Sequence, residues 1–117
     1  MSHYVMKDEV LDQLYKEREE LITKLNSKDN LAWDEYVLSG EIEAFNNVLS
    51  NYYFKRNPLE KNGWHWVDTD YLDSLIKDYK TDEVGVDSIE DVPNRGITTG
   101  NIIGLKRIIE ILNYRKV

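Results

Sequence analysis

The sequence predicts a mainly α-helical fold, in which an N-terminal antiparallel helical hairpin packs with two shorter C-terminal helices. Three observations predict it. Leucines recur at helical spacing near the start, a second apolar stripe follows a short polar break, and the last segment is apolar nearly all round. A chain of 117 residues suits one domain. Within 1–117 we expect neither an internal repeat nor a domain boundary.

Residues 7–26 predict the first helix of the hairpin. Its leucines share one face at the spacing of a coiled-coil seam, and they are Leu11, Leu14, Leu21 and Leu25. Arg18 falls on the same seam, where it would pair with Glu43 or Glu35 of the neighbouring helix. The Leu11–Leu25 seam could instead join two copies of the chain. A self-association or adaptor module is therefore one alternative function.

The second helix of the hairpin is expected over 31–54, after a polar break at 26–30. Its apolar face consists of Leu31, Leu38, Ile42, Phe45, Leu49 and Tyr52. Gly40 lowers helix stability by about 1 kcal/mol relative to alanine, so the helix could kink or break there. Together the two helices form a hairpin over 7–54, and residues 55–63 read as a loop because they contain Pro58 and Asn62-Gly63.

The C-terminal part, 64–117, is expected to hold two shorter helices. Residues 64–67 alternate large apolar and polar groups, which indicates a short β element. Asp68, Thr69 or Asp70 can cap the third helix, and Leu72, Leu75, Ile76 and Tyr79 are its buried stripe. Residues 81–99 read as irregular, with a second short β element at 84–86 and a turn at Pro93–Gly96. The last helix is expected from about 100 to 115.

The net charge of the chain limits the kinds of partner that it can bind. With 15 basic and 22 acidic side chains the chain carries −7, which argues against binding nucleic acid or an anionic membrane directly. It contains no cysteine, no apolar run of about 18 residues and no signal-peptide pattern at its start. We therefore expect a cytoplasmic protein whose partner is another protein, with a monomer favoured over a homodimer.

The acidic residues concentrate in one stretch, 67–92, where nine carboxylates stand against Lys77 and Lys80. The carboxylates are Asp68, Asp70, Asp73, Asp78, Asp82, Glu83, Asp87, Glu90 and Asp91. Apolar residues are threaded among them and should tie the backbone to the core, namely Leu72, Leu75, Ile76, Val84, Val86, Ile89 and Val92. Carboxylates held in this way would imitate a row of phosphates. The stretch predicts a non-enzymatic inhibitor that occupies the basic, nucleic-acid-binding surface of a partner protein.

Tryptophan is the residue type most suited to anchor such a partner. Trp64 and Trp66 lie two positions apart beside the acidic stretch, and we include them in the expected partner-binding surface. In a small domain with only two phenylalanines, tryptophan also serves as core filler. Burial is the expected state for Trp33, Trp64 and Trp66.

Other chemistry has little support in the sequence. Two histidines and no cysteine exclude a thiolate or three-histidine zinc site within one chain. Asp68–Asp73 begins like a calcium loop but lacks its glycine and a ligand. We expect no cofactor, no metal and no catalytic residue. A small enzyme that uses His65 with Asp68 or Asp70 as a general base is the third alternative. Gly96–Asn101, with Arg95 nearby, could receive an anion before the last helix, or could simply cap it.

The hairpin motifs Glu17-Arg18-Glu19-Glu20-Leu21 and Ser39-Gly40-Glu41-Ile42-Glu43-Ala44-Phe45 resemble those of small uncharacterised proteins of phages and mobile elements. Many such proteins are accessory factors. Some inhibit host-defence nucleases, and some of these inhibitors are acidic mimics of nucleic acid. The resemblance implies an inhibitor, but it identifies no named family and carries over no functional residue.

Overall fold

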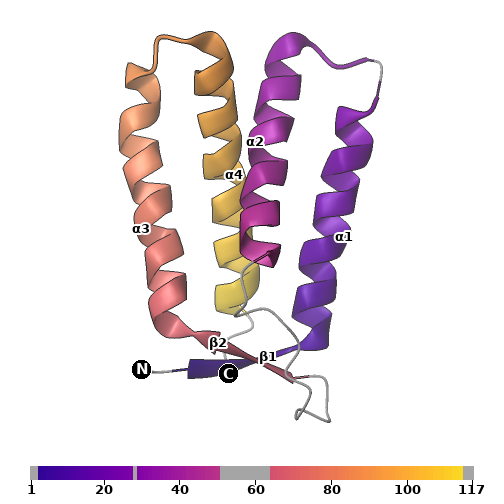
Figure 1. Ribbon diagram of the computed structural model, residues 1–117, viewed down its shortest axis with the longest axis vertical. Helices are drawn as coiled ribbons and strands as arrows, with labels where there is room; N and C mark the ends of the chain where they lie inside the picture. Colours follow the sequence, from indigo (N-terminus) through magenta and orange to yellow (C-terminus); the bar gives the residue numbers. More distant parts are fainter. Residues whose placement is uncertain (1–2, 28, 51–63, 115–117) are drawn as a thin grey trace.

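The computed structural model describes residues 3–27, 29–50 and 64–114, with side chains over 10–27, 29–50 and 73–112. In chain order the elements are β1 (His3–Lys7), α1 (Asp8–Leu25), α2 (Ala32–Leu49), β2 (Trp64–Asp68), α3 (Thr69–Gly85), the 3₁₀ turn η2 (Val86–Ser88) and α4 (Val92–Tyr114). Figure 1 shows the helices standing side by side, with both strands at one end. The mainly α-helical fold is therefore confirmed.

The two strands pair antiparallel and form a two-stranded sheet. The register places Val5 opposite Trp66 at the centre, with His3 opposite Asp68 and Lys7 opposite Trp64 at the ends. The β element expected at 64–67 is therefore present as β2. Its partner β1 was not expected: residues 3–6 were assigned to no element, and residue 7 was placed in the first helix.

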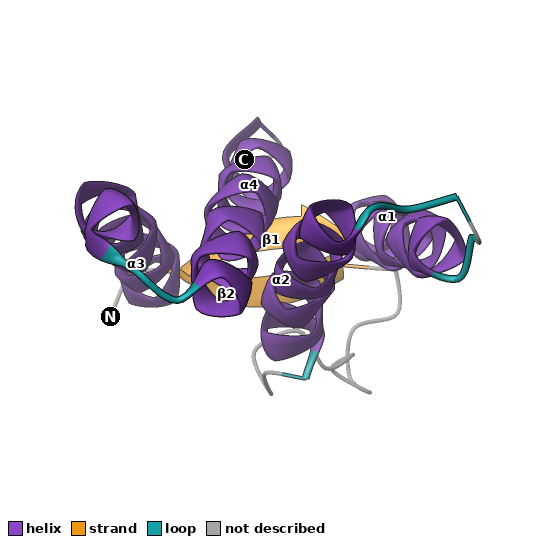
Figure 2. Cartoon of the chain, turned by 90° about the horizontal axis from the view of Figure 1, so that it is seen from above, coloured by secondary structure: helices purple, strands orange, loops and turns teal. Residues whose placement is uncertain are grey.

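The most extensive helix contact joins α2 to α4, whereas α1 packs on α2 and α3 packs on α4 over smaller areas. Figure 2 shows α2 and α4 in the middle of the bundle, flanked by α1 and α3. Glycines allow the central approach. A Cβ atom on Gly40 would collide with the carbonyl oxygen of Ile97, and one on Gly100 with that of Val37. Helix α2 continues unbroken through Gly40, where the missing side chain allows the close packing.

One hydrophobic core joins the helices. Its most deeply buried large side chains are Leu14 of α1, Phe45 and Val48 of α2, and Ile108 and Leu112 of α4. Leu75 of α3 is also buried, at 6% exposure, with Ile76 and Tyr79 packed beside the core. Leu11 and Leu21 pack against the same core. Leu11, Leu14 and Leu21 of the seam therefore pack in the interior of their own chain, as expected for the hairpin.

The expectation that residues 81–99 are irregular was wrong. Helix α3 continues to Gly85, so Val84 is helical, and Val86 begins the 3₁₀ turn; the β element expected at 84–86 is not there. Helix α4 begins at Val92, well before residue 100. Its start is capped by Asp91, whose carboxylate accepts a hydrogen bond from the backbone N–H of Asn94 (3.3 Å). Pro93 then falls in the first turn, where a proline needs no N–H partner.

Two smaller expectations also change. Helix α2 ends at Leu49, and the remainder of the expected helix, 51–54, lies outside the described residues with the loop at 55–63. Arg18 contacts neither Glu43 nor Glu35. Its guanidinium donates to Asn46 Oδ1 of α2 (3.3 Å) and to Glu19 Oε1 (3.1 Å), and it lies 5.1 Å from the ring centroid of Tyr15.

The chain contains an internal repeat, contrary to expectation. Each half is one strand followed by two helices: β1, α1 and α2 correspond to β2, α3 and α4. The sheet register is symmetric about Val5 and Trp66, and the glycine contacts of α2 and α4 are reciprocal. Residues 39–50 and 99–110 also show the same order of buried, half-buried and exposed positions. These three observations place a pseudo-twofold axis through the sheet and the α2–α4 contact.

The sequence of the two halves agrees with this symmetry. Leu11-Asp12-Gln13-Leu14-Tyr15-Lys16-Glu17 corresponds to Leu72-Asp73-Ser74-Leu75-Ile76-Lys77-Asp78, and Ser39-Gly40-Glu41-Ile42 corresponds to Thr99-Gly100-Asn101-Ile102. Equivalent residues are 61 positions apart in the strands and first helices, and 60 apart in the second helices. This numerical offset identifies the equivalent of any residue in the other half.

Candidate functional site

The acidic stretch does not present one face. Successive residues of a helix are rotated by about 100° around its axis. The side chains of Asp73, Asp78 and Glu83 in α3 are five residues apart, so each points about 140° away from the one before it. Asp78 and Asp82 face a groove toward α2 and α4, whereas Asp73 lies on an exposed surface outside that groove. Tyr79 Oη donates to Glu83 Oε2 (2.6 Å). The described carboxylates of α3 are therefore not arranged as a row of phosphates.

The ends of the stretch fall in different places. Asp68 is the last residue of β2, opposite His3, and Asp70 lies in the first turn of α3. Trp64 and Trp66 belong to β2, opposite Lys7 and Val5. The side chains of these four residues lie outside those described. Asp87, Glu90 and Asp91 lie at the other end of the bundle, between α3 and α4.

We call that other end the loop end and define it as residues 29–35 and 83–95, where α1 joins α2 and α3 joins α4 (Figure 1). It carries seven carboxylates and one cation, Arg95. The carboxylates are Asp29, Asp34, Glu35, Glu83, Asp87, Glu90 and Asp91. Arg95 is half-buried, and its Nε donates to the carbonyl oxygen of Ile89 (2.7 Å). The exposed charge of the loop end is therefore almost wholly negative.

Large apolar side chains are exposed at the same end. Leu31 is 73% exposed, Trp33 40%, Val84 86% and Val92 54%. Trp33 was expected to be buried, and so were Val84 and Val92 as tethers of the acidic stretch; these expectations were wrong. The Trp33 ring lies against α4, where its Cζ3 would be 3.4 Å from a Cβ atom on Gly96. Exposed apolar groups among carboxylates are typical of a surface that contacts another protein.

Part of this negative charge supports the helices themselves. Asp34 and Glu35 lie in the first turn of α2, where the helix dipole favours carboxylates, and Asp91 caps α4. Helices α2 and α4 both begin at the loop end, so their positive ends lie side by side there (Figure 2). Asp87 and Glu90 are exposed and belong to neither first turn. They remain available to a partner.

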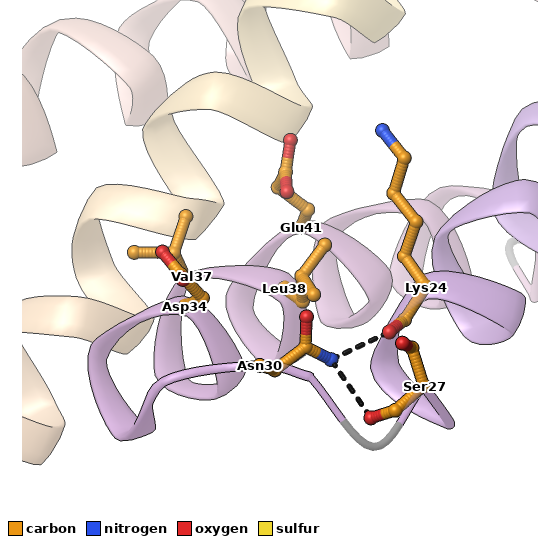
Figure 3. Close-up of a pocket in the computed structure, with 7 residues that line it drawn as sticks. All are labelled: Lys24, Ser27, Asn30, Asp34, Val37, Leu38 and Glu41. Atoms are coloured by element: carbon orange, nitrogen blue, oxygen red, sulfur yellow. Dashed lines mark hydrogen bonds between the residues drawn. The ribbon is translucent and has the colours of Figure 1, made fainter.

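A pocket of about 320 Å³ opens between α1 and α2 next to the loop end (Figure 3). Lys24 and Glu41 line it, and Asn30 closes one side by donating to the backbone carbonyl of Ser27 (3.4 Å). Burial raises the pKa of Glu41, and the positive charge of Lys24 opposes this rise only in part. The pocket is open to solvent, and its lining holds two carboxylates, Glu41 and Asp34.

The strongest described ion pair joins α1 to α4. Arg107 Nε donates to Glu17 Oε1 (2.6 Å) and Arg107 Nη2 donates to Glu17 Oε2 (3.0 Å), which is the bidentate arrangement of a guanidinium on a carboxylate. Gln13 Nε2 donates to the same carboxylate (2.7 Å). Burial alone would raise the pKa of Glu17, but the hydrogen bonds from Arg107 and Gln13 outweigh it and lower the pKa.

The described residues bring no metal-binding cluster together. No three histidine or acidic side chains among them could hold a metal ion. The side chain of His65, and those of Asp68 and Asp70, lie outside the described set. The anion site suggested at Gly96–Asn101 was wrong, because these residues are inside α4 and Thr99 Oγ1 donates to the carbonyl oxygen of Arg95 (2.7 Å).

Sequence reasoning missed the residues of the loop end that precede the acidic stretch, above all Leu31, Trp33 and Asp34. They lie about sixty residues before the start of α4, and only the parallel pairing of α2 with α4 brings them to the same end of the bundle. Among the helices that the structure describes, none is long and apolar enough to cross a membrane.

Comparison with known proteins adds no assignment: no family model, curated protein or solved structure matches this chain.

Proposed function

We propose that this protein is a non-enzymatic inhibitor that binds the basic, nucleic-acid-binding surface of another protein. The observation that carries the proposal is the loop end, where exposed Leu31, Trp33 and Val92 lie among seven carboxylates with a single cation. Apolar contacts supply affinity, and the carboxylates select a partner surface rich in lysine and arginine. The net charge of −7 supports the same class of partner.

The proposed contact differs from a row of carboxylates along 68–91. Of that stretch it uses Glu83, Asp87 and Glu90, joined by Asp34 and Glu35 from α2. The partner's basic surface is therefore covered by one end of the bundle. A surface that binds phosphates is the kind that such an anionic end would occupy, and occupation would exclude the nucleic acid.

Two triple variants with the same change of charge test the proposal. The loop-end variant carries Asp34→Lys, Asp87→Lys and Glu90→Lys. The control variant carries Asp12→Lys, Glu43→Lys and Asp73→Lys, whose native side chains are exposed but lie outside the loop end. Each immobilised protein is used to capture proteins from a bacterial lysate at low and at high salt, and duplex DNA is added as competitor.

The proposal predicts capture of a basic protein at low salt by the native chain and by the control variant. High salt, duplex DNA and the loop-end variant should each abolish that capture. Capture that survives the loop-end variant, or that is indifferent to salt, contradicts the proposal. Circular dichroism spectra of the native chain and both variants serve as the control, and they should show equal helix content.

A further inference from the structure

The internal repeat gives the bundle two equivalent grooves. The first has about 150 Å³ and lies between α1, α2 and α4; the second has about 400 Å³ and lies between α3, α4 and α2. Their linings correspond under the offset of the repeat, in the pairs Glu17 and Asp78, Arg107 and Asn47, and Leu21 and Asp82. The chain therefore contains two versions of one site, and they can be compared directly.

In the first groove a guanidinium lies on the carboxylate. Both oxygens of Glu17 accept hydrogen bonds from Arg107, at 2.6 and 3.0 Å. Lys24 lines the same groove beside Glu41. Three carboxylates line this groove, the third being Glu20, and two cations from the same chain offset most of their negative charge.

The second groove has two carboxylates in its lining and no cation: Asp78 corresponds to Glu17, and Asp82 stands where the first groove has Leu21. Asp78 and Asp82 lie one turn apart on α3 and both line it, while Asn47 stands where the first groove has Arg107. None of the residues lining this groove is a lysine or an arginine. Aspartate is one methylene shorter than glutamate and asparagine is shorter than arginine, which accounts for the larger volume.

Ionisation of Asp82 is less favourable than that of a free aspartate. Asp82 is half-buried, and burial, together with the negative charge of Asp78, raises the pKa of its carboxyl. Amide and hydroxyl groups surround the pair, from Asn47, Asn101 and Thr81. They supply hydrogen-bond acceptors but no positive charge.

We infer that the second groove binds the guanidinium of an arginine side chain from the partner protein, in the position that Arg107 occupies in the first groove. Arginine suits the groove better than lysine, because its planar fork donates to several acceptors at once. A metal ion is disfavoured, since within the described chain no three acidic or histidine side chains converge. The inference rests on the proposed function, in which the partner carries a basic surface.

The test titrates the full chain with acetyl-arginine amide and follows its backbone amides by NMR. Binding should shift amides of α3 near Asp78 and of α2 near Asn47. Asp78→Asn should weaken binding about tenfold, because a charge-assisted hydrogen bond is lost. Asp73→Asn makes the same change of charge on the same helix outside the groove, and it should change binding by less than about twofold. Acetyl-lysine amide should bind more weakly than the arginine probe.

A second variant fills the groove from within. Asn47→Arg should place a guanidinium on Asp78, raise the melting temperature and abolish binding of the arginine probe. Equal effects of Asp78→Asn and Asp73→Asn, or equal binding of the arginine and lysine probes, would overturn the inference. The proposed function is judged separately: if capture of the basic partner depends on the loop end but not on Asp78, the groove inference fails and the proposed function stands.

Discussion

Gly40 of α2 and Gly100 of α4 make reciprocal contacts across the pseudo-twofold axis. Each lets the backbone of its own helix reach the backbone of the other, Gly40 at Ile97 and Gly100 at Val37. Two parallel helices can approach this closely only where no side chain stands between them. The α2–α4 pair is therefore the centre of the fold, and each of the outer helices packs against one member of it.

Gly100→Ala should destabilise the protein by about 3 kcal/mol, because the added Cβ atom meets the backbone of α2 and the helices must separate. Gly85→Ala is the matched control, since a Cβ atom there meets nothing within 4 Å. It should change the free energy of unfolding by less than about 1 kcal/mol. Urea unfolding followed by circular dichroism measures both. Similar losses in the two variants would contradict the close contact.

Glu17→Gln should lower the free energy of unfolding at neutral pH by about 1 kcal/mol or less, since Arg107 is 47% exposed and solvent weakens the pair. The lowered pKa of Glu17 makes this contribution fully present above the pKa of an unfolded glutamate. It is lost as the pH falls through the lower pKa of the folded state. The difference between variant and native protein should thus disappear in acid. Glu43→Gln, at an exposed position, serves as control.

Leu14→Ala and Leu75→Ala should each cost about 2–5 kcal/mol, because both equivalent leucines are buried in the common core. Both variants should unfold in a single transition if the two halves form one cooperative unit. Val84→Ala, at a side chain that is 86% exposed, should change stability by less than about 0.5 kcal/mol. A separate early transition in either leucine variant would show that the halves unfold independently.

The parts of the fold that could be predicted from sequence depend on regular spacing. The leucines of α1 and the apolar face of α2 recur at helical intervals, so both helices and the burial of Leu14 and Phe45 were expected correctly. The start of α3 at Thr69 agrees with the expected cap at Asp68, Thr69 or Asp70, because short polar residues there precede an apolar stripe.

The start of α4 was mispredicted because local signals pointed the other way. Pro93 and Gly96 are typical of a turn, yet proline is tolerated in a first helical turn and Gly96 lies against Tyr36 of α2. Gly96, Gly100 and Gly104 recur every four residues on one face of α4. That spacing is typical of close helix packing. Whether a glycine marks a turn or a helix contact is decided by the presence of a neighbouring helix. The local conformational preferences of proline and glycine carry no information about the contact of α4 with α2.

The candidate site was predicted only in its charge. Four of its seven carboxylates were predicted as site residues, namely Glu83, Asp87, Glu90 and Asp91. The contribution of Asp34 and Trp33 was not, because it depends on how the two halves pair. The repeat itself left a signal in the sequence, in the match of Leu11–Glu17 to Leu72–Asp78. Few positions outside the core are identical, because exposed residues of the two halves are free to differ.

Covalent joining of the two strand–helix–helix units removes a constraint that a true homodimer obeys. In a homodimer a single mutation alters both symmetric sites together, whereas here it alters one. The chain has Arg107 on one side of the axis and Asn47 at the equivalent position on the other. Glu17 in the first groove is therefore paired with a guanidinium of its own chain, whereas Asp78 in the second groove faces an uncharged amide. A scaffold of this kind can evolve a one-sided recognition surface without weakening the symmetric contacts that fold it.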